Sequence, residues 1–288
     1  MQRLLVGFVI ALVLVCTSGF SAFAADRFST SVVVPFDLVR GNMIVVKCSV
    51  GGLRDLTAIV DTGTSETVLD IEVVRKLSLA TEPDSATFVT QQAKVEAVAI
   101  PGLQLGPVRV DQLQGIATDL SYWTAELGIR PQVLIGMDVL RRSSFLIDYR
   151  SHRLVFGPPP RLAHSAPLVL PQSDSRFALV ESSVRGKTLR LKVDSGCNGL
   201  LLYRGLPEAI TELPRPGSSL ASPAQALHAQ SLDSPILQIG AWRRSGVQVL
   251  VLDEAPPQFA VFDGLIGATV LSQRRLAFDF TNEIVSWD

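Results

Sequence analysis

The fold of this chain is decided by two stretches, Ala58-Ile59-Val60-Asp61-Thr62-Gly63 and Leu191-Lys192-Val193-Asp194-Ser195-Gly196. In both, a mostly apolar approach leads into an aspartate, a hydroxyl residue and a glycine. The apolar approach predicts a buried strand, and the glycine permits a tight turn because it carries no Cβ. Each aspartate is therefore expected at the end of a rigid strand.

A second pair of motifs follows the first at almost the same distance. The stretch Val133-Leu134-Ile135-Gly136 is echoed by Gly264-Leu265-Ile266-Gly267. The interval from Asp61 to Gly136 is nearly equal to the interval from Asp194 to Gly267. Ordered matches at a nearly constant offset predict an internal duplication, and therefore two similar lobes.

A proline-rich stretch separates the two copies. It begins at Gly157-Pro158-Pro159-Pro160, a composition typical of a linker. The predicted organisation has four parts: a signal peptide over 1–24, an N-terminal lobe over 28–157, a linker over 158–167 and a C-terminal lobe over 168–288.

Short apolar or alternating runs, separated by Gly and Pro, indicate strands through most of the chain. Strands are expected at 31–36, 43–50, 56–60, 108–112, 177–184, 189–193 and 247–252. Short helices are expected at 71–77, 137–142 and 268–273. A hairpin turn is expected at Arg185-Gly186. The predicted fold class is all-β for the most part, in two similar lobes with few short helices.

The segment 1–24 has the pattern of a secretory signal peptide. Arg3 precedes an apolar run, and small residues end the segment at Ala22-Phe23-Ala24. The run is too short for a permanent membrane span, and no later segment is long enough. We expect cleavage near Ala24 and a periplasmic or secreted protein. Because Cys16 follows the bulky Val15, we do not expect a lipoprotein anchor there.

Composition excludes several functional classes. The 288 residues include 26 Lys and Arg against 27 Asp and Glu, and 18% are charged, which argues against a dedicated nucleic-acid binder. The three histidines lack the spacing of metal ligands, so we predict no metal site, and no cofactor. After the signal peptide, Cys48 and Cys197 remain, either as a disulfide or as two separate thiols.

The two aspartates suggest a reaction. If the lobes pack about a pseudo-two-fold axis, Asp61 and Asp194 meet and share one proton, because adjacent carboxylates do not both ionise. The ionised member can activate a water molecule as a general base, while the protonated member donates to the carbonyl under attack. This arrangement predicts amide hydrolysis with neither a metal nor a covalent intermediate.

On these residues, the sequence resembles the bacterial retropepsin-like aspartic peptidases, in which two lobes similar to retroviral protease subunits lie on one chain in a pepsin-like plan. The resemblance covers 28–288. It implies an aspartic endopeptidase, a hydrolase that works as a monomer on an extended peptide in a cleft between the lobes. It also implies that Thr62 and Ser195 bond across to the opposite loop, and that Gly63 and Gly196 direct N–H groups at the carboxylates. The later glycine motifs would pack behind these loops.

The sequence also departs from this pattern. The stretch expected to form the flap, 87–100, lacks tip glycines and a tyrosine, and we expect its tip at Gln91-Gln92, the candidate substrate-binding residues. Cys197 stands where the first lobe has Thr64, and a thiol is a weak donor, so Asp194 should be supported less than Asp61. These departures leave open an alternative, an inactive protein of the same fold that binds peptides or envelope partners.

Overall fold

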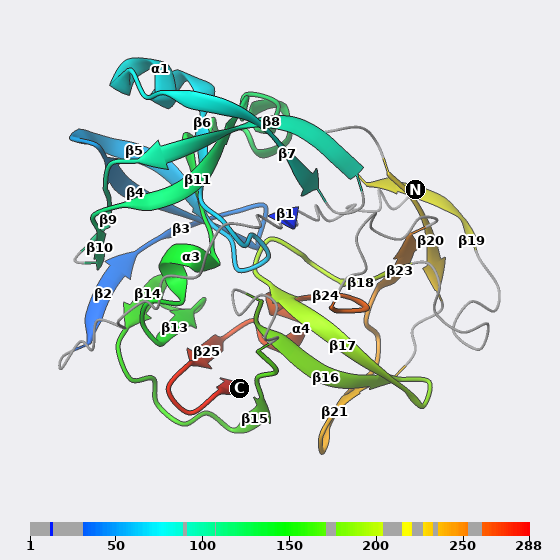
Figure 1. Cartoon of the computed structure of the whole chain (residues 1–288). Coiled ribbons are helices and arrows are strands. Elements are labelled where there is room, and N and C mark those ends of the chain that lie inside the picture. The colour runs from blue at the N-terminus through cyan, green and yellow to red at the C-terminus, as the bar shows by residue number, and fades with distance from the viewer. Residues whose placement is uncertain are drawn as a thin grey trace.

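The computed structural model describes residues 12–13, 31–88, 91–106, 108–170, 177–203, 215–220, 227–232, 236–252 and 261–288. Within these ranges the chain is mostly β with few short helices, as the sequence predicts (Figure 1). The strands form three sheets, and there are four helices. No helix in this part of the chain is long and apolar enough to cross a membrane. Apart from residues 12–13, the predicted signal peptide, with Cys16 and Ala24, lies outside the described residues.

The first sheet is built from the first half of the chain. Its strands are β1 (Leu12–Val13), β3 (Asp37–Val39), β4 (Met43–Val50), β5 (Leu53–Val60), β6 (Val68–Asp70), β7 (Thr81–Phe88), β8 (Gln91–Ile100), β9 (Leu103–Leu105), β10 (Val108–Val110), β11 (Leu113–Thr118) and β12 (Val133–Ile135). Their order is β1-β7-β8-β11-β6-β12-β5-β4-β9-β10, with β3 paired to β4. The parallel pairing of β12 with β5 sets the second motif directly beside the first.

A second large sheet is built from the second half. Its strands are β16 (Leu179–Val184), β17 (Lys187–Asp194), β18 (Leu200–Leu202), β19 (Arg215–Leu220), β20 (Leu227–Leu232), β21 (Leu237–Ile239), β22 (Trp242–Arg244), β23 (Val249–Leu252) and β24 (Gly264–Gly267). Their order is β19-β20-β23-β18-β24-β17-β16-β21-β22. From β7 onward the first sheet has the same order, strand for strand, so β17 occupies the place of β5 and β24 the place of β12.

A third sheet joins the two halves. It contains β2 (Val32–Pro35), β13 (Phe145–Asp148), β14 (Arg153–Phe156), β15 (His164–Pro167), β25 (Arg275–Asp279) and β26 (Ile284–Trp287). In its centre β13 from the first half pairs with β25 from the second, and the rings of Phe145 and Phe278 stack with 4.8 Å between centroids. Figure 1 shows the green β13 beside the red β25. One hydrophobic core runs through this sheet into both halves.

The last four residues of the predicted linker, His164–Pro167, form a strand in the structure. Residues 158–163 are irregular, but β15 pairs with β26 at the edge of the joining sheet. Its sequence, His164-Ser165-Ala166-Pro167, has a single buried side chain and ends in proline, which an edge strand tolerates. The stretch therefore lacks the hydrophobic alternation by which a strand is recognised.

The helices are α1 (Ile71–Leu77), α2 (Trp123–Leu127), α3 (Met137–Leu140) and α4 (Ala268–Leu271). The prediction of α1 is confirmed in its bounds, whereas α3 and α4 end slightly earlier than expected. Asp70 caps α1 by accepting a hydrogen bond from the Glu72 N–H at 3.0 Å. Helix α2 was not predicted, because so short a segment does not display a helical period.

The hairpin turn predicted at Arg185-Gly186 is confirmed. Val184 pairs with Lys187 across the turn, and both turn residues have positive φ, 50° for Arg185 and 79° for Gly186. This is the two-residue geometry that matches the twist of a hairpin.

Candidate active site

Asp61 and Asp194 lie at the ends of central strands, as predicted. Asp61 follows β5 and donates its N–H to the Ile135 carbonyl at 3.0 Å, while Asp194 is the last residue of β17. Both residues have no exposed surface. A Cβ added to Gly196 would lie 3.2 Å from Asp194 Oδ1 and 3.4 Å from Asp61 Oδ1. The fold thus brings two carboxylates from different halves of the chain together against one glycine.

Two hydroxyl groups tie the aspartate loops to each other. Thr62 Oγ1 donates to the Val193 carbonyl at 2.9 Å and accepts from the Ser195 N–H at 2.9 Å. Ser195 Oγ donates to the Val60 carbonyl at 3.1 Å and accepts from the Thr62 N–H at 3.0 Å. These four buried bonds have the cross-loop geometry that the resemblance implies, and they fix the separation of the carboxylates.

The hydrogen bonds to the two carboxylates are unequal. Asp61 accepts from the Gly63 N–H at 2.8 Å and from Thr64 Oγ1 at 2.8 Å. Asp194 accepts from the Gly196 N–H at 2.7 Å, but its Oδ2 has no partner among the described residues. Cys197, in the position of Thr64, turns its thiol to the Gly199 carbonyl at 3.3 Å instead. The weaker support expected for Asp194 is thus present in the geometry.

The later glycines pack behind the aspartate loops. The Met137 N–H donates to the Thr64 carbonyl at 2.8 Å, and a Cβ on Gly136 would lie 2.8 Å from the Glu66 carbonyl oxygen. The Gly267 N–H donates to the Gly199 carbonyl at 2.8 Å, and a Cβ there would overlap the backbone at Cys197. Only a glycine allows this close approach in either lobe.

Burial raises the pKa of both acids. The pKa of Asp61 is raised by desolvation, against hydrogen bonds from Thr64 and Gly63 and the charge of Lys192, which lower it. The pKa of Asp194 is raised well above its ordinary value of 3.8, by desolvation first and by the charge of Asp61 second. Asp61 accepts two hydrogen bonds where Asp194 accepts one, so the ionised form is better supported at Asp61.

Lys192 is the residue that the sequence analysis missed. It has no exposed surface, and its Nζ donates to the Gly63 carbonyl at 2.5 Å. On the other side, Asn42 Nδ2 donates to the Gly196 carbonyl at 3.0 Å. A buried donor thus holds each glycine carbonyl. The sequence did contain a signal for it: Lys192 interrupts an apolar stretch that leads into Asp194, whereas the equivalent position before Asp61 is Ile59.

The cysteines are two separate thiols, which resolves the alternative left open by the sequence. Cys48 and Cys197 are both free and buried. Desolvation raises the pKa of Cys48 to about 12 and that of Cys197 further still. Neither is therefore poised to act as a thiolate nucleophile.

The hairpin expected as the flap is formed by β7 and β8, and its turn differs from the prediction. Gln91 and Gln92 are the first residues of β8 and pair with Phe88 and Thr87, so the chain reverses between Phe88 and Gln91. Residues 89–90 and the side chains of both glutamines lie outside the described part of the structure. The hairpin also starts earlier, at Thr81 rather than at 87. Among the side chains of β7 that the structure describes, only Ala86 is buried, so the strand lacks the apolar alternation by which strands are recognised.

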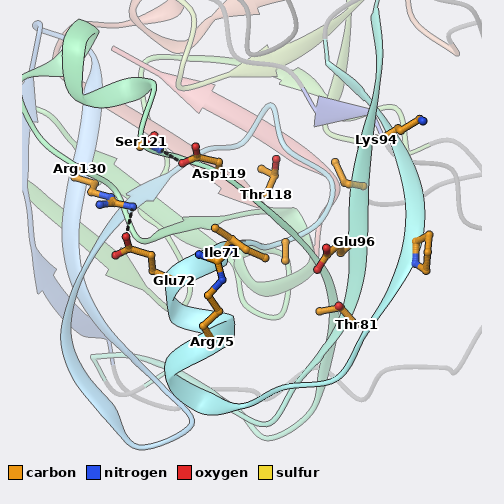
Figure 2. Close-up of a pocket in the computed structure, with 13 residues that line it drawn as sticks. Ile71, Glu72, Arg75, Thr81, Lys94, Glu96, Thr118, Asp119, Ser121 and Arg130 are labelled. Carbon is orange, nitrogen blue, oxygen red and sulfur yellow. Dashed lines mark hydrogen bonds and ion pairs between the residues drawn. The ribbon is translucent and has the colours of Figure 1, made fainter.

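A hollow of about 920 Å³ is lined by residues of α1, the β7–β8 hairpin and the segment after β11, and by no residue of either aspartate loop. Figure 2 shows its walls, α1 on one side and the β7–β8 hairpin with Thr81 and Glu96 on the other. Arg130 crosses one wall to Glu72 at 3.0 Å. Among all the residues that the structure describes, no group of three or more His, Cys, Asp or Glu side chains could hold a metal ion.

Replacing Thr62 with Val is expected to cost about 2–5 kcal/mol of unfolding free energy, because two buried groups would lose their partner at about 1–3 kcal/mol each. The orphaned groups are the Ser195 N–H and the Val193 carbonyl. Urea denaturation measures the loss. Thr57→Val is the matched control, since Thr57 Oγ1 bonds the exposed Lys47 at 3.0 Å. Equal losses in the two variants would contradict the structural role of the cross-loop bonds.

Two comparisons connect this geometry with known proteins. The family model described as "Aspartyl protease" matches residues 46–139. The aspartic proteinase from Irpex lacteus matches in structure with a TM-score of 0.53 and 15% sequence identity, over 89% of this chain and 96% of that one. None of the curated sequences compared with the chain matches it significantly. The chain thus has the aspartic-proteinase fold over most of its length, and with the aspartyl protease match over 46–139 this supports the retropepsin-like or pepsin-like family predicted from the sequence.

Proposed function

We propose that this protein is an aspartic endopeptidase in which Asp61 and Asp194 activate a water molecule to hydrolyse peptide bonds. The observation that carries the proposal is the meeting of two buried carboxylates, each at the end of an equivalent strand, with their loops tied by Thr62 and Ser195. Two acids so close share one proton and can serve as base and acid in the same step.

The unequal hydrogen bonding supports a division of roles. Asp61, with two donors on its carboxylate, is the general base that takes a proton from the attacking water. Asp194, whose Oδ2 has no partner among the described residues, holds the shared proton and donates it to the scissile carbonyl oxygen as that carbon becomes tetrahedral. Collapse of the intermediate then breaks the C–N bond, and the amine leaves with a proton returned from the pair.

The substrate in this proposal is a peptide or protein segment in extended conformation. A strand-like peptide is recognised by backbone pairing with a hairpin, here β7–β8, in which Gln91 and Gln92 follow the turn as the first residues of β8. Because neither carboxylate has exposed surface, residues covering the pair must move before a peptide reaches it.

The organisation and location are part of the same proposal. The matching strand order of the two large sheets supports two lobes over 28–157 and 168–288 that arose by internal duplication. With both aspartates on one chain, a monomer suffices. We further propose that cleavage near Ala24 releases the protein into the periplasm or the medium.

The test is digestion of a diverse peptide mixture by the purified protein, with the cut sites identified by mass spectrometry. We expect cuts with a bell-shaped pH dependence, because uptake of a second proton by the pair at low pH and loss of its last proton at high pH each stop the reaction. A folded protein that cuts nothing between about pH 3 and 7 would contradict the proposal. If it still bound peptides, the alternative of an inactive binding protein would replace it.

A further inference from the structure

The aspartate pair has a buried cation beside it. Lys192 is fully buried, and it is the one basic side chain that is buried among the residues the structure describes. It precedes Asp194 by two positions on β17, and Ile59 precedes Asp61 by two positions on β5. The two otherwise similar strands therefore differ by one full charge next to the pair. A buried charge is costly unless nearby groups compensate it.

The surroundings of Lys192 suit an ammonium group. Its Nζ donates to the Gly63 carbonyl at 2.5 Å, across the boundary between the two aspartate loops. It also lies 4.8 Å from the ring centroid of Phe262 and 5.3 Å from that of Phe177, both within the range of cation–π attraction. The corresponding contact on Gly196 is made by the neutral amide of Asn42. The cation therefore sits on one side of the pair, within the loop system that holds Asp61.

On the basis of the function proposed above, we propose that Lys192 is a positioning residue of the aspartate pair, whose ammonium neutralises the one negative charge that the working pair carries. With Asp61 ionised, Asp194 protonated and Lys192 cationic, the buried group has no net charge. Such a group can be kept out of water without taking up a second proton.

The electrostatic interactions in the site agree with this role. The charge of Lys192 lowers the pKa of Asp61 and that of Asp194, against the rise that burial causes. The other acidic groups facing the pair are the Cys197 thiol and three phenols. The charge of Asp194 acts on Tyr149 and Tyr203 and that of Asp61 on Tyr122, and burial raises the pKa of all three phenols and of the thiol, so they stay neutral in the working pH range. Glu66, in the Asp61 loop, is a further nearly buried acid.

Substituting Gln for Lys192 removes the charge and keeps a donor for the Gly63 carbonyl. Without the ammonium, ionisation of both acids becomes harder, so we expect the acidic and alkaline limbs of the pH–activity profile to move upward together by about one pH unit or more. Lys192→Arg retains the charge and should restore both limbs. Ile59→Met, an apolar exchange at the equivalent position, should leave both limbs where they are in the parent protein.

A second readout needs no substrate. Carboxyl ¹³C NMR of the free protein should show the titration of the pair at higher pH in Lys192→Gln than in the parent protein. If the parent protein cuts no peptide, this titration still decides the role of Lys192 separately from the peptidase function. A variant that is less stable but has unmoved limbs and an unmoved titration would overturn the proposal, since Lys192 would then be a packing residue only.

Discussion

Replacing Asp194 with Asn is expected to lower kcat/KM for peptide cleavage by about 10³-fold or more, since the pair loses its shared proton donor and general acid–base catalysis is worth about 10²–10⁴-fold. The amide cannot supply a proton to the scissile carbonyl oxygen. Asp61→Asn should have an effect of the same order, because the base on the other side of the water is lost. Kinetics on a peptide identified from the digest measure both variants.

The matched control is Asp148→Asn. Asp148 also follows an apolar strand, but it accepts hydrogen bonds from the Arg150 and Ser151 N–H groups in an exposed turn. We expect this variant to retain the activity of the parent protein. Retained cleavage in Asp61→Asn or Asp194→Asn would place the chemistry elsewhere and rule out the pair.

Although Asp194→Asn should lower activity, it should not lower stability. The pKa of Asp194 is raised well above 3.8 in the folded protein, so between these values the folded state binds more protons than the unfolded state. Stability therefore falls as pH rises through the folded pKa, and the neutral Asn removes this loss. Asp194→Asn should be at least as stable as the parent protein at neutral pH. The comparison of urea midpoints at acidic and neutral pH thus separates lost chemistry from lost folding.

Much of the fold could be predicted from the sequence because its central strands are buried. Strand β4 and helix α1 were predicted at their observed bounds, since β4 is a short apolar run bounded by turn residues and the apolar residues of α1 recur at helical spacing. The Asp-Thr-Gly and Asp-Ser-Gly turns could be recognised for a related reason. One such turn would mean little, because Asp and Gly are common where a strand enters a turn, but two copies in register are a specific signal.

Other features could not be predicted, for physical reasons. Strands β7 and β15 each have a single buried side chain among those described, so their sequences carry no alternation, and the turn of the β7–β8 hairpin was placed two residues too late. The role of Lys192 depends on its contacts with Gly63, Phe177 and Phe262. These residues are distant from Lys192 in the sequence and come close to it only in the folded protein. No local pattern in the sequence contains that information.

Replacing Gly63 with Ala is expected to lower kcat/KM by about 10²-fold or more, the scale on which small misplacements of catalytic groups act. A Cβ at Gly63 would overlap the Asp194 carboxylate, with Asp194 Oδ1 at 2.6 Å. The carboxylate belongs to the opposite loop, which Ser195 and Thr62 hold in place, so it cannot yield without disturbing the cross-loop bonds. Overpacking of this kind should also cost about 1–3 kcal/mol of stability.

The other glycines provide a graded series for this prediction. A Cβ at Gly196 would be tight rather than overlapping, at 3.2 Å from Asp194 Oδ1, so Gly196→Ala should be the milder variant. A Cβ at Gly102 would make an ordinary contact, 3.5 Å from the Asp111 carbonyl oxygen, and Gly102→Ala should retain full activity. Because all three changes add the same methyl group, differences in kcat/KM report the space around the pair. Equal activity in Gly63→Ala and Gly102→Ala would mean that the Asp194 carboxylate lies farther from Gly63 in the working enzyme than in this structure.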